Sequence, residues 1–181
     1  NGISGGSAME RRLGLFFDGA GVTIYEGYGL TESTAAATAN PPEQTRFGTV
    51  GRPIPGTTVH IADDGEVIVK GANIFMGYFG KEGAVNREDF DEDGWFHTGD
   101  IGRIDEDGYI YITDRKKDIL ITAGGKNVAP QNIENTLKTD KYISEALVYG
   151  DRRKFLTALI TLDEEAATEW ANEKGVGFSD F

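Results

Sequence analysis

Alternating apolar and polar residues predict two β-hairpins in the middle of the chain. Residues 57–70 and residues 101–112 each alternate on both sides of a central Asp-Gly pair. An Asp-Gly pair between two alternating runs is a strong short-range hairpin signal. We therefore expect two antiparallel hairpins with tight turns.

The second hairpin brings two charged residues to its base. Asp100 stands directly before its first strand, and Arg115 follows its second. A carboxylate and a guanidinium in this position either form an ordinary ion pair at the strand ends or clamp a diol or a phosphate. Spacing alone favours the ordinary ion pair.

The first part of the chain is predicted to form a turn, a helix and a strand. Residues 3–7 are small and rich in glycine, and apolar residues from Met9 to Phe16 then repeat at helical spacing. Two glycines end this helix before a short strand at 22–25. A glycine turn that opens a helix can hold an anion or admit a flat ring, but it is more often a tight connection.

Two further stretches carry structural expectations. Residues 33–47 are small and polar and contain two prolines, so we expect an exposed loop there. Tyr78 and Phe79 are expected to lie in the core.

The last third of the chain is predicted to form an α+β lobe. Its expected elements are a strand at 119–122, a helix at 131–138 led by Pro130, strands at 144–149 and 155–162, and a helix from the cap Asp163 to Trp170. The fold class predicted for the whole chain is therefore mixed α+β.

Composition excludes several classes of function. The 181 residues are 39% hydrophobic, which is enough for one ordinary domain or two small ones. A net charge of −12 argues against binding to nucleic acid or to an anionic membrane. The absence of cysteine excludes disulfides and thiolate sites and suits a cytoplasmic location. No apolar run reaches the roughly 18 residues that a membrane span needs, and no signal peptide is visible.

The two histidines and the acidic residues at 89–100 predict no metal site. His60 and His97 are far apart in sequence and lack partners at metal-site spacing, and no Ser-His-Asp arrangement is available. The acidic residues at 89–100 match the calcium-loop template, but residues 101–112 alternate as a strand where that motif needs a helix. We assign these carboxylates to a turn and a solvated face.

Three short stretches carry candidate chemistry. In residues 27–32, glycines on both sides of Tyr28 leave its ring open to stack on a flat molecule. Thr31 and Glu32 add the hard oxygen ligands that Mg²⁺ prefers, although a plain loop with a capping threonine is the alternative. Residues 114–118 form the densest basic cluster of an acidic chain, which is either a solvated face or a site for a polyanion. Residues 123–126 form a loop whose bare backbone can lie against a ligand.

Several of these motifs, taken in order, resemble the adenylate-forming, AMP-binding superfamily. They are Tyr28-Gly29-Leu30-Thr31-Glu32, Thr98-Gly99-Asp100, the segment 114–118 and the segment 122–134. The sequence of the last segment, TAGGKNVAPQNIE, is most similar to that of long-chain fatty acyl-CoA synthetases. The resemblance implies that residues 1–115 form the β-rich end of the large AMP-binding domain. It implies that residues 116–181 form a hinge and an incomplete small α+β domain.

The resemblance also implies a role for each matching residue. Contacts with ATP or AMP are implied for Gly5, Gly6, Ser7, Tyr28, Gly29, Thr31, Asp100 and Arg115. Catalytic roles are implied for Thr31 and Glu32, with Glu32 as the ligand of Mg²⁺. Lys117 and Asp118 would form the hinge, and Gly124, Gly125 and Lys126 would contact CoA.

The implied activity is that of an ATP-dependent long-chain fatty acid–CoA ligase, with fatty acid, ATP and CoA as its small-molecule partners. One alternative is a nucleotide-binding module without catalysis, and another is a ligase of the same superfamily for a different carboxylic acid. Preference for acyl chain length, the oligomeric state and any peripheral membrane contact through regions outside this chain stay open.

The chain starts at Asn1 without a methionine, so we expect it to be a piece of a longer protein. The family's phosphate-binding loop would precede Asn1, and its catalytic lysine near the C-terminus would lie beyond Phe181. We therefore expect the isolated chain to be inactive.

Overall fold

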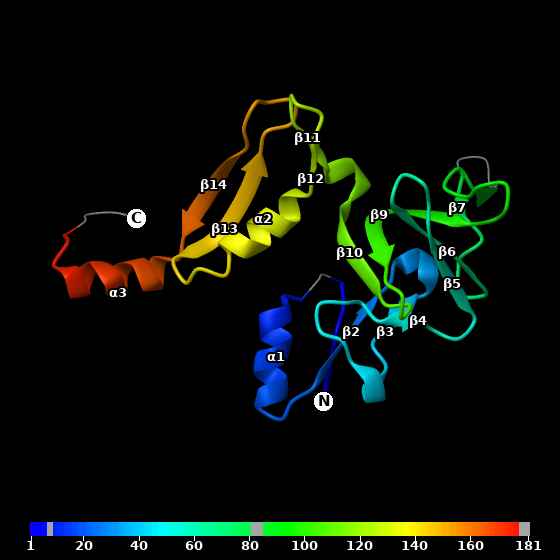
Figure 1. Cartoon of the computed structure of the whole chain (residues 1–181), viewed down its shortest axis with the longest axis horizontal. Helices are drawn as coiled ribbons and strands as arrows, with labels where there is room; N and C mark the ends of the chain where they lie inside the picture. Colours follow the sequence, from blue (N-terminus) through cyan, green and yellow to red (C-terminus); the bar gives the residue numbers. More distant parts are fainter. Residues whose placement is uncertain (7–8, 81–84, 178–181) are drawn as a thin grey trace. The chain divides into compact units, whose positions relative to one another are not determined.

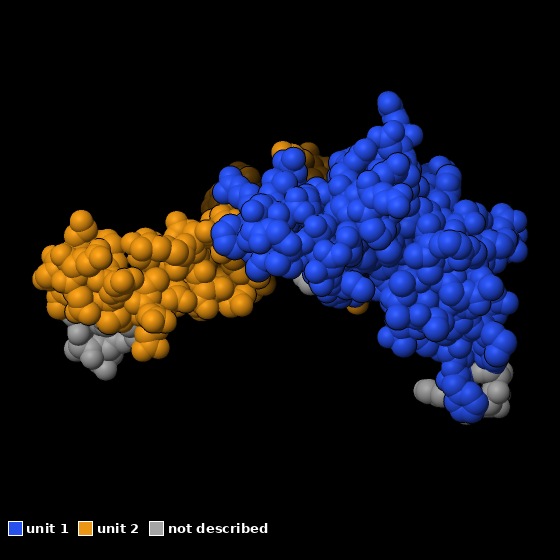
Figure 2. Space-filling model, turned by 90° about the horizontal axis from the view of Figure 1, so that it is seen from below, with its two compact units in different colours: residues 1–116 blue, residues 117–181 orange. Residues whose placement is uncertain are grey.

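The computed structural model describes residues 1–6, 9–80 and 85–177. The chain divides into two compact units, residues 1–116 (unit 1) and residues 117–181 (unit 2), which Figure 2 shows in blue and orange. Both units combine helices with sheets, so the mixed α+β class predicted from the sequence is confirmed.

The described part of unit 1 contains two four-stranded sheets (Figure 1). The first contains β1 (Gly2–Ser4), β2 (Ile24–Tyr28), β3 (Thr38–Ala39) and β4 (Arg52–Pro53). The second, in the order β10-β9-β6-β5, contains β5 (Thr57–Ile61), β6 (Glu66–Gly71), β9 (Phe96–Ile104) and β10 (Ile110–Arg115). The remaining elements are α1 (Arg11–Gly19), β7 (Tyr78–Phe79), β8 (Val85–Asn86) and the short 3₁₀ helices at Thr31–Ser33, Pro42–Gln44 and Lys116–Asp118.

Both predicted hairpins are confirmed. Strand β5 pairs antiparallel with β6, and β9 pairs antiparallel with β10. Val67, Val69 and Ile110 from these strands have no exposed surface and belong to the main apolar cluster of unit 1. Ile110 also exchanges backbone hydrogen bonds with Val50 and Gly51, which ties the hairpin to the chain that leads into β4.

The prediction of an exposed loop at 33–47 is wrong for part of the stretch: residues 34, 35, 39 and 42–44 are exposed, whereas residues 33, 37, 38 and 40 are buried. Ala37 and Thr38 have no exposed surface, and the buried amide of Asn40 donates to the carbonyls of Glu26 and Thr49. The small side chains of this stretch let it pass through the interior beside β2. Their polar groups are satisfied there by backbone partners, as burial requires.

The prediction that Tyr78 and Phe79 lie in the core is also wrong. Phe79 is 87% exposed and Tyr78 is 44% exposed. Both stand on β7, which pairs only with β8 among the described strands, and such a two-stranded ribbon leaves its side chains near solvent.

The beginning of the chain is more extended than the sequence predicts. Residues 2–4 form β1, which pairs parallel with β2, so the glycine-rich turn begins only after Ser4. The strand predicted at 22–25 begins at Ile24 and continues through Tyr28, because it pairs with β1 on one side and β3 on the other. The predicted helix is present as α1.

Unit 2 follows the predicted order of elements. It contains β11 (Leu120–Ile121), β12 (Asn127–Val128), α2 (Pro130–Leu137), β13 (Ile143–Tyr149), β14 (Thr157–Leu162) and α3 (Glu164–Lys174). Helix α2 packs against β13, and Glu134 accepts a hydrogen bond from the N–H of Val148 at 2.7 Å. Asp163 caps α3 as predicted, accepting from the N–H of Ala166 at 2.8 Å, and the helix extends to Lys174.

Among the helices of the described residues, none has both the length and the apolar character that a membrane crossing requires.

Candidate functional site

The β9–β10 hairpin brings Asp100 and Arg115 together, as the sequence predicts. The two residues are register partners, and Nε of Arg115 lies 3.0 Å from Oδ1 of Asp100. Tyr28, from β2 in the other sheet of unit 1, donates its hydroxyl to Oδ2 of Asp100 at 2.6 Å. The carboxylate is buried, whereas 44% of the Arg115 side chain is exposed. These three residues are called the Asp100 cluster below.

The Asp100 cluster is arranged to accept hydrogen bonds from a ligand. Burial and the neighbouring charge of Asp100 raise the pKa of Tyr28, so its hydroxyl stays protonated and donates. A carboxylate has about four acceptor positions, so the two donors from Tyr28 and Arg115 leave capacity for the hydroxyls of a bound diol.

A bulge in β9 aims Asp100 at its partners. Across the neighbouring strand β6, Glu66 pairs with Ile101 whereas Ile68 pairs with His97, so β9 holds extra residues between these two pairs. Gly99 lies in this bulge with φ of +73°, a value that favours glycine. Bulges of this kind redirect a side chain out of the regular alternation of a strand.

Thr98 stabilises the bulge from inside. It is buried, and its hydroxyl donates to the carbonyl of Val67 at 2.6 Å. The same hydroxyl oxygen accepts from the N–H of Asp100 at 3.1 Å. Thr98 therefore satisfies the Asp100 N–H within the bulge.

The glycines around Tyr28 serve packing. A Cβ atom on Gly29 would lie 1.7 Å from the carbonyl oxygen of Ala35, so only glycine allows the chain to pass there. The ring of Tyr28 is half-buried and packs against the apolar cluster of unit 1. The ring of Tyr28 is therefore open only in part, on the side that does not face this cluster.

Thr31 and Glu32 lie on the 3₁₀ turn that follows β2. Thr31 is exposed and Glu32 is half-buried. Oε1 of Glu32 accepts the hydroxyl of Tyr78 at 2.6 Å, and this bond raises the pKa of Tyr78 to about 12. The backbone carbonyl of Glu32 also accepts the N–H of Phe75, which connects the turn to the segment before β7.

The residues present fit a magnesium ion only together with a ligand that carries phosphates. No group of three or more histidine, cysteine or acidic side chains in the described part of the chain could hold a metal ion. Mg²⁺ is commonly bound through one or two carboxylates, with waters and substrate phosphates completing its shell. Glu32 offers one such carboxylate.

Gly5 and Gly6 lie beside the strand that carries Tyr28. A Cβ on Gly5 would lie 3.5 Å from the carbonyl oxygen of Gly27, and Gly6 has φ of +83°. Met9 is bonded to β2, because its N–H donates to Oε1 of Glu26 at 2.7 Å. Ser7 lies outside the described residues.

The remaining predicted site residues belong to unit 2. Lys117 and Asp118 are its first two residues, and both are exposed on a 3₁₀ turn. Gly124, Gly125 and Lys126 form the exposed turn between β11 and β12, where Gly125 has φ of +78°. The structure thus gathers Tyr28, Asp100 and Arg115 within unit 1.

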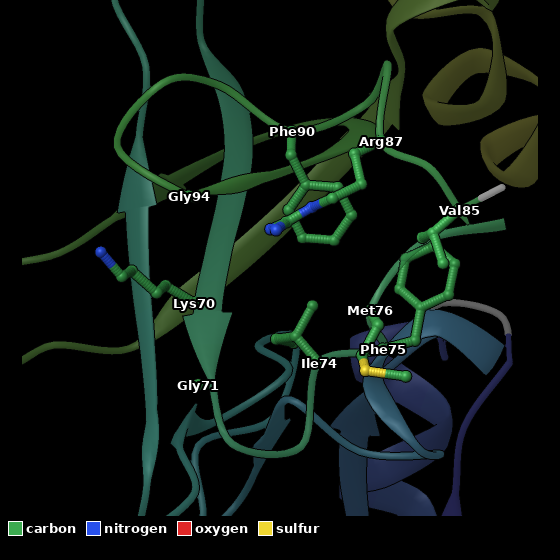
Figure 3. Close-up of a pocket in the computed structure, with 9 residues that line it drawn as sticks. All are labelled: Lys70, Gly71, Ile74, Phe75, Met76, Val85, Arg87, Phe90 and Gly94. Atoms are coloured by element: carbon green, nitrogen blue, oxygen red, sulfur yellow. The ribbon is translucent and has the colours of Figure 1, made fainter.

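A separate pocket of about 690 Å³ lies in unit 1 (Figure 3). Its apolar lining includes Ile74, Phe75 and Met76, and the guanidinium of Arg87 lies 4.4 Å from the centre of the Phe90 ring. None of the predicted site residues lines it, although Phe75 bonds to Glu32 through its backbone.

Two family models match the chain. The AMP-binding enzyme model matches residues 2–79, and the AMP-binding enzyme C-terminal domain model matches residues 117–176. The chain is also 50% identical over 179 residues to the long-chain-fatty-acid–CoA ligase FadD15 of Mycobacterium bovis. The chain belongs to the AMP-binding enzyme family. The matched part is 98% of this chain but 30% of FadD15, so the chain spans about a third of that relative's length.

Other members of the AMP-binding enzyme family match with similar coverage. The long-chain-fatty-acid–CoA ligase ACSBG1 of Rattus norvegicus is 43% identical over 164 residues, which are 87% of this chain and 23% of ACSBG1. A structure of O-succinylbenzoate CoA synthetase (MenE) from Bacillus subtilis with the acyl-adenylate OSB-AMP has a TM-score of 0.81 and 28% identity, covering 99% of this chain and 40% of its own. A MenE structure in complex with ATP and magnesium ion has a TM-score of 0.78 and 29% identity. The match covers 96% of this chain and 40% of the MenE chain.

The prediction from sequence missed the residues that support the Asp100 cluster. Glu66 is buried, and its Oε2 lies 2.8 Å from Nδ1 of His97, a residue that the sequence left without a role. The available signal was a glutamate directly before the apolar run 67–69, because an acidic side chain on a buried strand needs partners.

Proposed function

We propose that this chain is part of an ATP-dependent long-chain fatty acid–CoA ligase. The observation that best supports this proposal is the Asp100 cluster. It joins Tyr28 from one family motif to Asp100 and Arg115 from two others within unit 1. The 50% identity to a long-chain-fatty-acid–CoA ligase supports a long-chain fatty acid as the substrate.

The proposed reaction has two half-reactions. A carboxylate oxygen of the fatty acid attacks the α-phosphate of ATP, which gives acyl-AMP and releases pyrophosphate. The sulfur of CoA, after loss of its thiol proton, then attacks the acyl carbon, and AMP leaves. Adenylation is needed because a free carboxylate is a poor electrophile. No covalent enzyme intermediate forms, so the protein contributes positioning and charge stabilisation.

Unit 1 would hold the nucleotide. Asp100 accepts the two ribose hydroxyls, and Arg115 donates from the exposed side of the pair. Tyr28 packs on the adenine with the part of its ring that is not buried, next to Gly5, Gly6, Ser7 and Gly29. Thr31 donates to a phosphate, and Glu32 binds Mg²⁺, which when bound offsets negative charge on the phosphates.

Unit 2 would serve the second half-reaction. The chain divides between Lys116 and Lys117, and we propose Lys117 and Asp118 as the joint between the two units. Gly124, Gly125 and Lys126 would contact CoA, with the backbone of the two glycines against its extended arm and Lys126 near a phosphate. If the joint moves, Lys117→Pro fixes φ there and slows thioester formation more than adenylation, whereas equal slowing of the two steps contradicts the joint.

The test uses the complete ligase that contains this chain. It is incubated with ATP, Mg²⁺, CoA and a panel of short-chain, long-chain and aromatic acids, and AMP release and acyl-CoA formation are followed. We expect long-chain fatty acids to give the highest kcat/KM. A preference for another acid would replace the proposed substrate, and ATP binding without turnover on the panel would favour the non-catalytic module.

The same assay tests the isolated chain. We propose that the 181 residues alone form no acyl-CoA, because they span about 30% of the length of FadD15 and would lack groups that stabilise charge in the complete ligase. Charge stabilisation is usually the largest contribution to such a reaction. Palmitoyl-CoA formation that co-purifies with the isolated chain would contradict this proposal.

A further inference from the structure

Glu66 is a buried carboxylate that the proposed reaction does not use. It stands at the start of β6 with 3% of its surface exposed. Its Oε1 accepts the N–H of Gly99 at 2.8 Å. Its Oε2 accepts from Nδ1 of His97 at 2.8 Å and from Nζ of Lys116 at 2.9 Å.

These three donors keep Glu66 ionised. Burial by itself raises the pKa of Glu66, but the hydrogen bonds from His97, Lys116 and Gly99 outweigh burial and hold the pKa below its usual value. Hydrogen bonds to an ionised carboxylate are shorter and stronger than those between neutral groups. Glu66 is therefore a fixed anionic anchor for the groups around it.

One arm of this anchor holds the bulge that carries Asp100. The register between β6 and β9 shifts next to Glu66, and the N–H of Gly99 in the bulge is bonded to the Glu66 side chain. A backbone N–H left without a partner inside the protein is costly, so this bond stabilises the bulged conformation. Asp100 is the next residue along the chain.

The Oε2 atom of Glu66 holds Lys116, the residue after Arg115. Lys116 is the last residue of unit 1, and its Nζ also lies 2.6 Å from Oδ2 of Asp64. Hydrogen bonds from Lys116 to Asp64 and Glu66 raise its pKa, so it stays charged at neutral pH. Arg115 is thus followed directly by an anchored residue.

We propose that Glu66 is a positioning residue that fixes the Asp100–Arg115 pair from both sides. It acts through Gly99 on one strand and through Lys116 on the other. The inference rests on the proposed nucleotide role of that pair, and it assigns no contact with substrate to Glu66 itself.

The first test measures the Kd of ATP for the complete ligase by calorimetry. Glu66→Ala removes the hydrogen bonds to the Gly99 N–H and to Lys116, and we expect about tenfold weaker ATP binding, which is about 1.4 kcal/mol. Glu66→Gln keeps an acceptor for Gly99 but loses the charge that holds Lys116, and we expect a partial rescue to about threefold weaker binding. The matched control Asp64→Asn removes the charge of the exposed partner of Lys116 and keeps an oxygen that can accept the N–H of Glu66, and we expect a change within about twofold.

Wild-type ATP affinity in either Glu66 variant overturns the proposal. If Glu66→Ala does not fold, the milder Glu66→Gln variant decides by the same criterion. A loss of affinity in Glu66→Gln as large as in Glu66→Ala also contradicts it, because the retained acceptor for Gly99 would then have no effect.

The second test needs no ligase activity. Hydrogen exchange is followed by NMR in the 181-residue chain, comparing the Gly99 amide with the Val148 amide of unit 2. We expect Glu66→Ala to speed exchange at Gly99 at least about tenfold and Glu66→Gln to speed it much less, with Val148 unchanged in both. Unchanged exchange at Gly99 overturns the proposal. An inactive complete protein whose ATP affinity and Gly99 exchange respond as expected would instead contradict only the proposed ligase function.

Discussion

The two hairpins that carry proposed binding residues are held in different ways. In the β9–β10 hairpin, the carboxylate of Asp100 is buried and bonded to Tyr28, which stands 72 residues earlier in the sequence. In the β11–β12 hairpin, residues 123–126 are exposed, and the long-range bond of this turn, from the N–H of Ala123 to the carbonyl of Arg153 at 2.9 Å, joins it to another exposed segment.

This difference in support predicts different behaviour. Long-range side-chain bonds and a packed core fix the first hairpin before a ligand binds, which lowers the ordering cost of recognising a rigid ribose. A turn whose hydrogen bonds are exposed to solvent and that has no buried apolar side chain opens at low free-energy cost. We expect the second hairpin to adapt its backbone to the flexible arm of CoA.

The largest expected effect is on the free energy of unfolding, and it should differ between two isoleucines, one from each hairpin. Ile110 in β10 has no exposed surface, whereas Ile121 in β11 is 50% exposed. We expect Ile110→Ala to lower the free energy of unfolding of unit 1 by about 2–5 kcal/mol. Ile121→Ala in unit 2 should cost less than about 1 kcal/mol. Urea unfolding, followed by NMR signals of each unit, measures both; equal costs would show that the second hairpin is packed as firmly as the first.

The next effect concerns nucleotide binding by the first hairpin. Charge-assisted hydrogen bonds contribute about 1.5–3 kcal/mol each, so Asp100→Ala in the complete ligase should weaken ATP at least about tenfold. The matched control Asp63→Ala removes an exposed carboxylate from the turn between β5 and β6 and should leave ATP binding unchanged. Calorimetry at constant salt checks both, and an unchanged ATP affinity in Asp100→Ala would remove Asp100 from the nucleotide site.

The smallest expected effect is a difference in stability between alanine substitutions at two neighbouring glycines in the second hairpin. Gly125 has φ of +78°, so Gly125→Ala places a side chain in a left-handed conformation at a cost of about 1 kcal/mol. Gly124→Ala meets only the Thr122 hydroxyl at 3.9 Å and should change stability little.

Amide exchange of residues 120–128 reports the stability of this turn, and calorimetry reports its CoA affinity in the complete ligase. We expect Gly125→Ala to speed exchange and to weaken CoA several-fold relative to Gly124→Ala. Identical behaviour of the two variants would argue that the turn conformation has no part in CoA binding.

Sequence by itself determined the features that depend on neighbouring residues. The Asp-Gly turns specified both central hairpins and brought Asp100 and Arg115 to the base of the second one, where a bulge between Ile112 and Asp114 makes the two residues register partners. Asp163 was recognisable as a helix cap because capping uses an N–H only three residues away. The family motifs added the proposed roles of Tyr28 and Glu32.

Only the tertiary structure decided which polar residues are buried and what they bond. Residues 37, 38 and 40 are buried and Phe79 is exposed, although composition indicated the reverse, because burial depends on which strands find partners in a sheet. The bond from Lys116 to Glu66 spans 50 residues of sequence. No local pattern encodes such a contact, since it forms only when the two segments have already folded onto the same sheet.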